Sequence, residues 1–313
     1  MNARPIIIDT DPGQDDAFAI LLALSSPELD VLGISAVAGN VSVDKAEINA
    51  RKICDLAGRS GIPVFRGCDR PLKRDLRTAE HIHGESGLDG ADLPAPKTPL
   101  QPKHAVDWIV ETVMAAPEGT ITLCPLGPLT NIASAFAREP ELPARLKEIV
   151  LMGGGFFQGG NITPAAEFNI YVDPHAADIV FRAGVRITMM PLDVTHRALI
   201  PVDWPEKLKD MGNRTGAAGA GLIEFYQRYD LERYGETGGP LHDPCVIAWL
   251  VEPDIFKGRE CNVRIETGSE MTMGMTVVDW WNATKLPATA TVINRLDAPR
   301  FFDLMLERFR TLP

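Results

Sequence analysis

The chain has 313 residues, of which 45% are hydrophobic and 23% charged, and it carries a formal net charge of −11 at pH 7. This composition is typical of a globular protein that buries a sizeable core. The acidic balance and the absence of a basic stretch argue against a surface for nucleic acid or anionic membranes, and they favour a small neutral substrate. No apolar segment reaches the roughly 20 residues that span a bilayer, so no membrane association is expected.

Cysteine usage and the amino terminus both predict a cytoplasmic location. The five cysteines are odd in number and form no C-x-x-C pair, which is typical of reduced thiols. The chain enters an apolar run at Pro5 without the charged and apolar regions of a secretion signal.

Strand-like and helix-like segments alternate through the first two thirds of the chain. Strands are expected near 5–9, 31–37, 63–66, 120–124, 147–152 and 186–190. Helices are expected near 15–25, 43–57, 103–116, 130–138 and 174–183. This alternation predicts βαβ units and therefore an α/β fold with a mainly parallel sheet.

Beyond Pro201 the pattern becomes helical and then returns to strands. Helices are expected near 216–232 and 243–250, strands at 261–266, 275–280 and 289–295, and a closing helix at 299–310. No internal repeat or low-complexity linker interrupts the chain, so a single domain over residues 1–313 is expected.

The segment Asp9–Asp16 contains four carboxylates directly after the apolar run Ile6–Ile8. Pro12 and Gly13 supply a turn, so the acids are expected at the carboxyl end of a buried strand, where open α/β sheets bind ligands. Carboxylates this close repel one another unless they stay solvated, take up protons or share a cation. An oxygen-only cluster suits Ca²⁺ or Mg²⁺ better than Zn²⁺. The alternative is a solvated acidic turn that only caps the next helix.

Further polar groups or irregular backbone follow other predicted strands. Asn40 follows the second strand, and the segment Pro125–Asn131 leaves backbone carbonyls free to act as Ca²⁺ ligands. The run Gly153–Gly155 allows close backbone approach but completes no phosphate-loop motif. Glu167 and Asn169 alternate with Phe168 just before a strand-like run at 170–172. Both are therefore expected on one face, where they could hold sugar hydroxyls.

Two histidine-bearing segments are further candidates for the site. His81–Gly87 lies within the long Pro- and Gly-rich stretch 67–101, which is either functional or an incidental surface loop. Leu241–Pro244 pairs His242, a possible proton donor, with Asp243, which either ligates a cation or only caps the following helix.

Taken together and in order, these segments resemble the inosine–uridine-preferring nucleoside hydrolase family over nearly the whole chain. The segments on which this resemblance rests are Asp9–Asp16, Gly39-Asn40, His81–Gly87, Pro125–Asn131, Leu151–Gly155, Glu167–Asn169 and His242–Pro244. Within the family, Pro164–Pro174 and Gly274–Asp279 look most similar to the bacterial pyrimidine-preferring ribonucleoside hydrolases. The resemblance implies one Rossmann-like α/β domain, a Ca²⁺ cofactor, hydrolysis of the N-glycosidic bond of ribonucleosides, and a homodimer or homotetramer.

The resemblance also implies a role for individual residues. The metal ligands would be the carboxylates of Asp11, Asp16 and Asp243 and the backbone carbonyl of Leu126. The ribose hydroxyls would be held by Asp15, Asn40, Asn161, Glu167, Asn169 and Asp243. Asp11 matches the general base, and His242 is the candidate acid for the leaving group. The candidates on the nucleobase side are Ile82, His83, Met152, Phe168, Tyr226, Gln227, Tyr229, Arg233 and Tyr234. For those beyond Phe168, the alternative is a helix face that packs on its neighbours.

Three other functions remain as alternatives at this point. A nonspecific inosine–uridine hydrolase would share the mechanism but not the pyrimidine preference. A phosphohydrolase of the haloacid dehalogenase type also begins with a strand and Asp-x-Asp, but it expects Thr or Val where this chain has Gly13. A non-catalytic nucleoside-binding protein would keep the fold and the polar residues.

Overall fold

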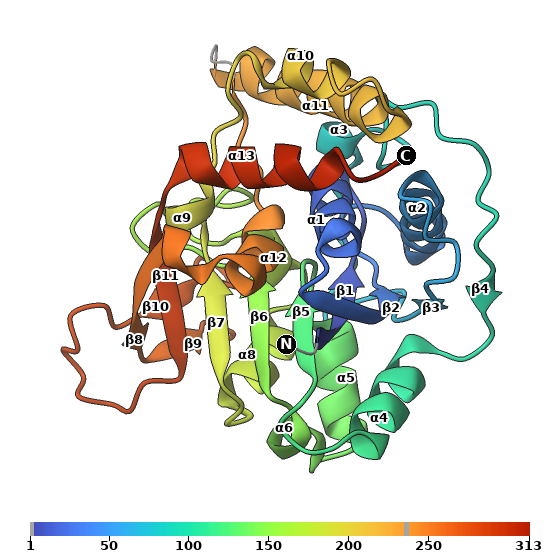
Figure 1. Cartoon of the computed structure of the whole chain (residues 1–313). Coiled ribbons are helices and arrows are strands. Elements are labelled where there is room, and N and C mark those ends of the chain that lie inside the picture. Colours follow the sequence, from blue (N-terminus) through green and yellow to red (C-terminus); the bar gives the residue numbers. More distant parts are fainter. Residues whose placement is uncertain (1–2, 235–237) are drawn as a thin grey trace.

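A single nine-stranded sheet forms the centre of the protein, which is described here by a computed structural model (Figure 1). The structure describes residues 3–234 and 238–313, without the side chains of residues 229, 230 and 232–234. The strand order is β4-β3-β2-β1-β5-β6-β7-β11-β8. Their bounds are β1 Arg4–Thr10, β2 Leu29–Ala36, β3 Val64–Arg66, β4 Leu100–Gln101, β5 Thr122–Pro125, β6 Glu148–Met152, β7 Ile187–Met190, β8 Phe256–Cys261 and β11 Ala290–Leu296.

Every neighbouring pair in this sheet is parallel except β11 and β8, which are antiparallel. Strands β9 (Val263–Ile265) and β10 (Thr276–Val278) form a separate antiparallel pair. The predicted α/β fold with a mainly parallel sheet is therefore confirmed.

Helices cover both faces of the sheet, and β1 shows why (Figure 1). Ile6 and Ile8 point into a core shared with α1 (Gln14–Ser25), α12 (Pro244–Val251) and α13 (Ala298–Phe309). Ile7 points the other way, into a core shared with α4 (Ala105–Ala115), α5 (Thr130–Arg138) and α8 (Pro174–Arg182). A strand buried on both faces reads as a continuous apolar run, which is what the sequence Ile6–Ile8 shows.

Among the remaining helices, α2 packs on the sheet beside α1 and the others lie in connections or at the rim of the fold. They are α2 Val43–Leu56, α3 Glu80–His83, α6 Leu142–Arg145, α7 Phe168–Val172, α9 Leu192–Thr195, α10 Trp204–Lys209, α11 Arg214–Tyr234 and the 3₁₀ turn Pro253–Ile255. The short helices α3, α6, α7, α9 and α10 and the strands β4 and β8 were not predicted from sequence. Strand β8 lies at the sheet edge and is mostly exposed, so it lacks the apolar pattern of the inner strands.

The strand expected at 170–172 is wrong, because this segment belongs to helix α7. The carboxylate of Glu167 accepts hydrogen bonds from the backbone N–H groups of Asn169 and Ile170. This N-cap satisfies donors that a helix leaves free at its start, so the local chain forms a helical turn despite its β-branched residues.

The cysteines and the apolar character of the helices bear on two further predictions. The five cysteines all carry free thiols, as predicted. In the described residues, we find no helix with both the length and the apolar character needed to cross a bilayer.

Candidate active site

A cavity of about 540 Å³ opens where four neighbouring strands, β2, β1, β5 and β6, end. Because the strands are parallel, the loops that follow them meet at one edge of the sheet. Thirteen of the site residues predicted from sequence line this cavity: Asp15, Asn40, Ile82, His83, Leu126, Met152, Asn161, Glu167, Phe168, Asn169, Tyr226, His242 and Asp243. The long stretch 67–101 contributes to it through α3, so its histidine segment lies at the site.

Other predicted residues lie outside the cavity wall. Asp11 and Asp16 are fully buried and do not line it. In helix α11, Tyr226 lines the cavity whereas Gln227 does not. The predicted contacts of Tyr229, Arg233 and Tyr234 fall on side chains outside the described residues.

The turn after β1 brings the acids together and fixes Asp16. The backbone N–H of Gly13 donates to Asp16 Oδ2 at 2.9 Å, and the side-chain amide of Asn40 donates to the same oxygen at 3.2 Å. The Thr10 hydroxyl donates to Asp16 Oδ1. Asp16 is thus held by three donors from the strand ends.

Asp11 lies between two glycines that allow its carboxylate to approach the backbone. A Cβ on Gly39 would lie 2.0 Å from Asp11 Oδ2, and one on Gly127 would lie 2.2 Å from Oδ1. The backbone N–H of Asn40 donates to Oδ2 at 2.6 Å. Glycine is therefore required on both sides of this carboxylate.

A cation fits the arrangement of the acids. Asp15, Asp16 and Asp243 each offer an oxygen, and these oxygens lie within 4.8 Å of one another. Asp243 is the N-cap residue of α12, yet its side chain makes no capping hydrogen bond, which argues against a purely structural role. Oδ1 of Asp11, of Asp15 and of Asp243 are all buried without a hydrogen-bond partner among the described residues. Buried carboxylate oxygens are normally paired or coordinate a metal, so this donor set suits a hard cation.

The electrostatics lead to the same conclusion. Burial, together with the charge of Asp16, raises the pKa of Asp15 to about 8. Burial and the neighbouring carboxylates also raise the pKa values of Asp11 and Asp243 well above the ordinary range. Protein groups alone therefore do not keep these acids ionised near neutral pH, and a bound cation would do so.

Asp9 belongs to a different, structural network. Its Oδ1 accepts hydrogen bonds from the Ser35 hydroxyl and from the Asn131 side-chain amide, the latter at 2.7 Å. It does not line the cavity. The acidic segment thus divides into one structural carboxylate and three at the site.

Polar groups near Leu126 form the next part of the wall. Asn169 donates from its side-chain amide to the Leu126 carbonyl at 2.6 Å. Glu167 Oε2 accepts from the backbone N–H of Gly154 at 2.8 Å, and burial raises the pKa of Glu167 to about 7. Asn161 is exposed, and its side-chain oxygen accepts from the Phe168 backbone at 2.9 Å.

Imidazoles line the rest of the cavity, which contains four of the six histidines in the chain, namely His81, His83, His196 and His242. His83 Nδ1 lies 2.6 Å from the Gln14 side-chain oxygen, and its ring stacks on Tyr226 with centroids 5.9 Å apart. Burial lowers the pKa of both His83 and His242 to about 3, so these rings are neutral near pH 7.

Sequence reasoning missed His196. Its ring centroid lies 5.8 Å from that of His242, and it follows β7 through the short helix α9. The available signal was its position a few residues beyond a strand whose carboxyl end lies at the same sheet edge.

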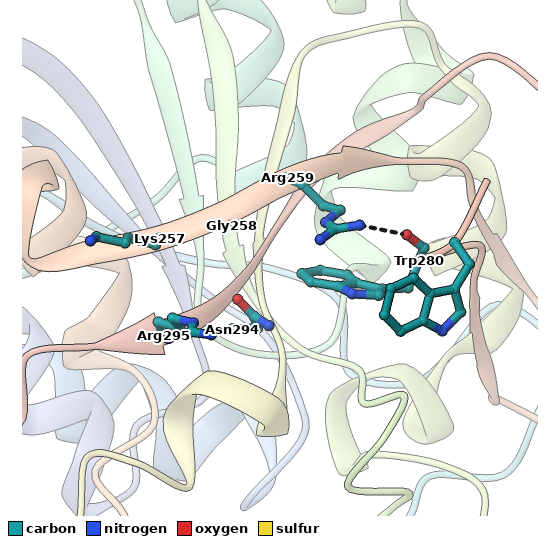
Figure 2. Close-up of a pocket in the computed structure, with 7 residues that line it drawn as sticks. Lys257, Gly258, Arg259, Trp280, Asn294 and Arg295 are labelled. Atoms are coloured by element: carbon teal, nitrogen blue, oxygen red, sulfur yellow. Dashed lines mark hydrogen bonds between the residues drawn. The ribbon is translucent and has the colours of Figure 1, made fainter.

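A second cavity of about 500 Å³ lies away from the acidic cluster, beside the edge strand β8 (Figure 2). Its described lining residues are Lys257, Gly258, Arg259, Trp280, Trp281, Asn294 and Arg295. Figure 2 shows the Arg259 guanidinium beside the Trp280 indole. The guanidinium carbon of Arg259 lies 4.3 Å from the centroid of that ring. This lining contains no carboxylate or imidazole, so the chemistry belongs to the first cavity.

Comparison with known proteins agrees with this geometry. The family model described as "Inosine-uridine preferring nucleoside hydrolase" matches residues 6–303. The chain is 49% identical to a pyrimidine-specific ribonucleoside hydrolase of Photobacterium profundum, covering 98% of each chain. It is 50% identical to an uncharacterized protein of Schizosaccharomyces pombe, covering 98% of this chain and 99% of the other.

Solved structures of nucleoside hydrolases share the fold. A purine-preferring ribonucleoside hydrolase from Gardnerella vaginalis superposes with a TM-score of 0.92 at 32% identity, covering 98% of each chain. A plant nucleoside hydrolase superposes with a TM-score of 0.89 at 34% identity, covering 99% of each chain. The fold, the site and the extent of these matches together assign the chain to the inosine–uridine-preferring nucleoside hydrolase family, as a ribonucleoside hydrolase.

Proposed function

We propose that this hydrolase prefers pyrimidine ribonucleosides, depends on Ca²⁺, and releases free base and ribose. The observation that carries the pyrimidine preference is the 49% identity to a relative named pyrimidine-specific, against 32% to a structure named purine-preferring. Family membership removes the support for a phosphohydrolase of the haloacid dehalogenase type.

The calcium proposal is supported by the unpaired buried oxygens of the acidic cluster. We assign Asp11, Asp16 and Asp243 and the Leu126 carbonyl to the cation. An oxygen of Asp15 also lies within 4.8 Å of oxygens of Asp16 and Asp243, but Asp15 lines the cavity whereas Asp11 and Asp16 lie behind its wall, so we assign Asp15 to a ribose hydroxyl. When bound, Ca²⁺ would lower the pKa of a water molecule beside it and help to orient the ribose diol.

The residues of the chain then divide the reaction between them. Asp11 accepts the proton of the attacking water, and the sugar develops oxocarbenium character as the N-glycosidic bond breaks. The ribose is held by Asp15, Asn40, Asn161, Glu167, Asn169 and Asp243. His242 supplies a hydrogen bond or a proton to the departing base. Ile82, His83, Met152 and Phe168 contact the base, and all four line the cavity.

Release of free ribose tests this proposal directly. Uridine, cytidine, inosine and adenosine would be compared with the enzyme as purified, after chelation, and after calcium is added back. Ribose that appears only with metal, and fastest from the pyrimidines, is the expected result. Faster inosine cleavage would overturn the pyrimidine preference, and full activity after chelation would overturn the calcium dependence. Uridine binding without ribose release by calcium-loaded protein would instead indicate a nucleoside-binding protein.

We also propose that residues 1–313 act as one hydrolase domain, located in the cytoplasm, and that the enzyme is a homodimer or homotetramer. The family resemblance supports the oligomer, and the reduced thiols agree with the location. Light scattering of the purified enzyme measures the mass, and a monomer would contradict the oligomer.

A further inference from the structure

Thr195, at the end of helix α9, contacts the ring of His242 from behind the cavity. Its hydroxyl oxygen lies 2.8 Å from His242 Nδ1. Thr195 is fully buried and does not line the cavity, whereas His242 does. The threonine therefore touches the histidine and not the space that a substrate would occupy.

The hydroxyl of Thr195 has one hydrogen and, among the described residues, no other hydrogen-bond partner. A buried hydroxyl hydrogen without an acceptor is costly, so the hydroxyl donates to Nδ1 of the neutral ring. The ring hydrogen must then sit on Nε2. If the ring gains a second proton, Nδ1 donates to the hydroxyl instead, and Nε2 still carries its hydrogen.

We propose that Thr195 is a positioning residue that fixes His242 as the Nε2–H tautomer, so that the ring presents an N–H donor to the nucleobase. The proposal deepens the role of His242 and rests on that role as proposed above. It implies that a good substrate offers a lone pair, from a carbonyl oxygen or a ring nitrogen, to this donor as the base departs.

Helix α9 is well anchored for this task. The carboxylate of Asp193 accepts hydrogen bonds from the backbone N–H groups of Phe156 and Phe157, both at 2.9 Å. Asp193 thereby ties α9 to the loop after β6. A partner hydroxyl on a fixed helix holds the imidazole in one orientation, which is the usual function of a group behind a catalytic or ligating histidine.

The matched variants are Thr195→Val, which keeps the shape and removes the hydroxyl, and Thr195→Ser, which keeps the hydroxyl. We expect Thr195→Val to lower kcat for uridine by about 10–100-fold with a smaller change in KM, as for other groups that orient a functional histidine. Thr195→Ser should stay within about threefold of the wild type, given the retained hydrogen bond. Equal losses in both variants would overturn the proposal, since packing alone would then explain them.

The tautomer itself is measured by ¹⁵N NMR of the calcium-loaded enzyme labelled at histidine, with His242→Ala used to assign the signal. The wild type should show hydrogen on Nε2 and an acceptor nitrogen at Nδ1, and Thr195→Val should show a mixture of tautomers. Hydrogen on Nδ1 in the wild type would overturn the proposal, whether or not the variant loses activity. If the tautomer is as proposed but His242→Ala cleaves uridine normally, the role of His242 fails and the geometry of the pair stands.

Discussion

At the scale of single residues, the hydrogen-bond partners of a carboxylate distinguish a structural role from a chemical one. Asp9 and Asp11 are the same residue type, two positions apart on one strand end. Asp9 accepts side-chain hydrogen bonds from Ser35 and Asn131 on Oδ1, whereas Asp11 accepts one from the Asn40 backbone on Oδ2. The other oxygen of each carboxylate has no partner among the described residues. A matched pair of substitutions can therefore separate structure from chemistry.

We expect Asp11→Asn to lower kcat for uridine by about 10²–10⁴-fold, the contribution typical of a general base. Asp9→Asn is the control, because the amide oxygen can still accept from Ser35 and Asn131, and it should retain most of the activity. Ribose release and thermal unfolding of both variants check this. Comparable activity in the two variants would refute the assignment of Asp11 as base.

The second prediction at this scale concerns leaving-group chemistry. His242→Ala should reduce uridine hydrolysis by about 10²–10⁴-fold, because the base then departs without the hydrogen bond or proton that His242 supplies. A ribosyl compound with a 4-nitrophenolate leaving group needs no such assistance, so its cleavage should change little. Rates for both substrates with wild type and variant provide the measurement. Equal losses for the two substrates would argue against acid catalysis by His242.

At the scale of elements, the loops after β1, β2 and β5 form the site because their backbones pack closely. Gly39 and Gly127, from two of these loops, enclose the Asp11 carboxylate. The side chain of Asp11 is fully buried, so these two glycines limit how far it can shift. Glycines in two neighbouring loops thus fix the position of the Asp11 carboxylate.

Gly127→Ala should displace Asp11, because the added Cβ would lie 2.2 Å from its Oδ1. A misplacement of about 1 Å at a reacting group can cost on the order of 10²-fold in rate. Gly61→Ala is the control, since a Cβ there meets no atom within 4 Å. We expect a large loss of kcat only for Gly127→Ala, measured by ribose release beside denaturant unfolding. Wild-type kcat in Gly127→Ala would show that Asp11 tolerates the shift.

At the scale of the whole molecule, the acidic site opposes folding unless a cation is present. Burial raises the pKa of Asp15 to about 8 and that of Glu167 to about 7, while both ionise near their ordinary values in the unfolded chain. As pH rises from about 4 to about 8, the unfolded state releases carboxyl protons that the folded state keeps. His83 and His242, with pKa values lowered to about 3, offset part of this effect below about pH 6.5, where they are charged only in the unfolded chain. The stability of metal-free protein should therefore fall over this range.

Calcium should reverse this trend, because it binds deprotonated carboxylates. At a free concentration of 100 times its Kd, a ligand of the folded state adds about 2.7 kcal/mol to stability. We expect Ca²⁺ to raise the Tm by on the order of 5 °C at pH 8 and by less at pH 5. Calorimetry of chelated and calcium-loaded enzyme at the two pH values tests this. A metal-free Tm that rises from pH 5 to pH 8 would contradict it.

Local sequence was sufficient to predict most of the fold and the location of the site. The alternation of apolar strands and helices indicated the parallel sheet, and the acids after Ile6–Ile8 indicated a ligand site at its edge. The same local reasoning failed for α7, where the side chain of Glu167 caps a helix that the β-branched run disfavours. Thr195, which lies behind the cavity wall, carried no local signal.

The sequence by itself therefore determined which kinds of group the site contains, because strand periodicity and turn chemistry depend on near neighbours. Only the tertiary structure decided which acid is structural and which lie at the site, since the partners of Asp9 lie 26 and 122 residues away in sequence. It also brought Thr195 to His242 across 47 residues. Contacts at such separations depend on how strands and helices pack, and the spacing of residues along the chain does not encode them.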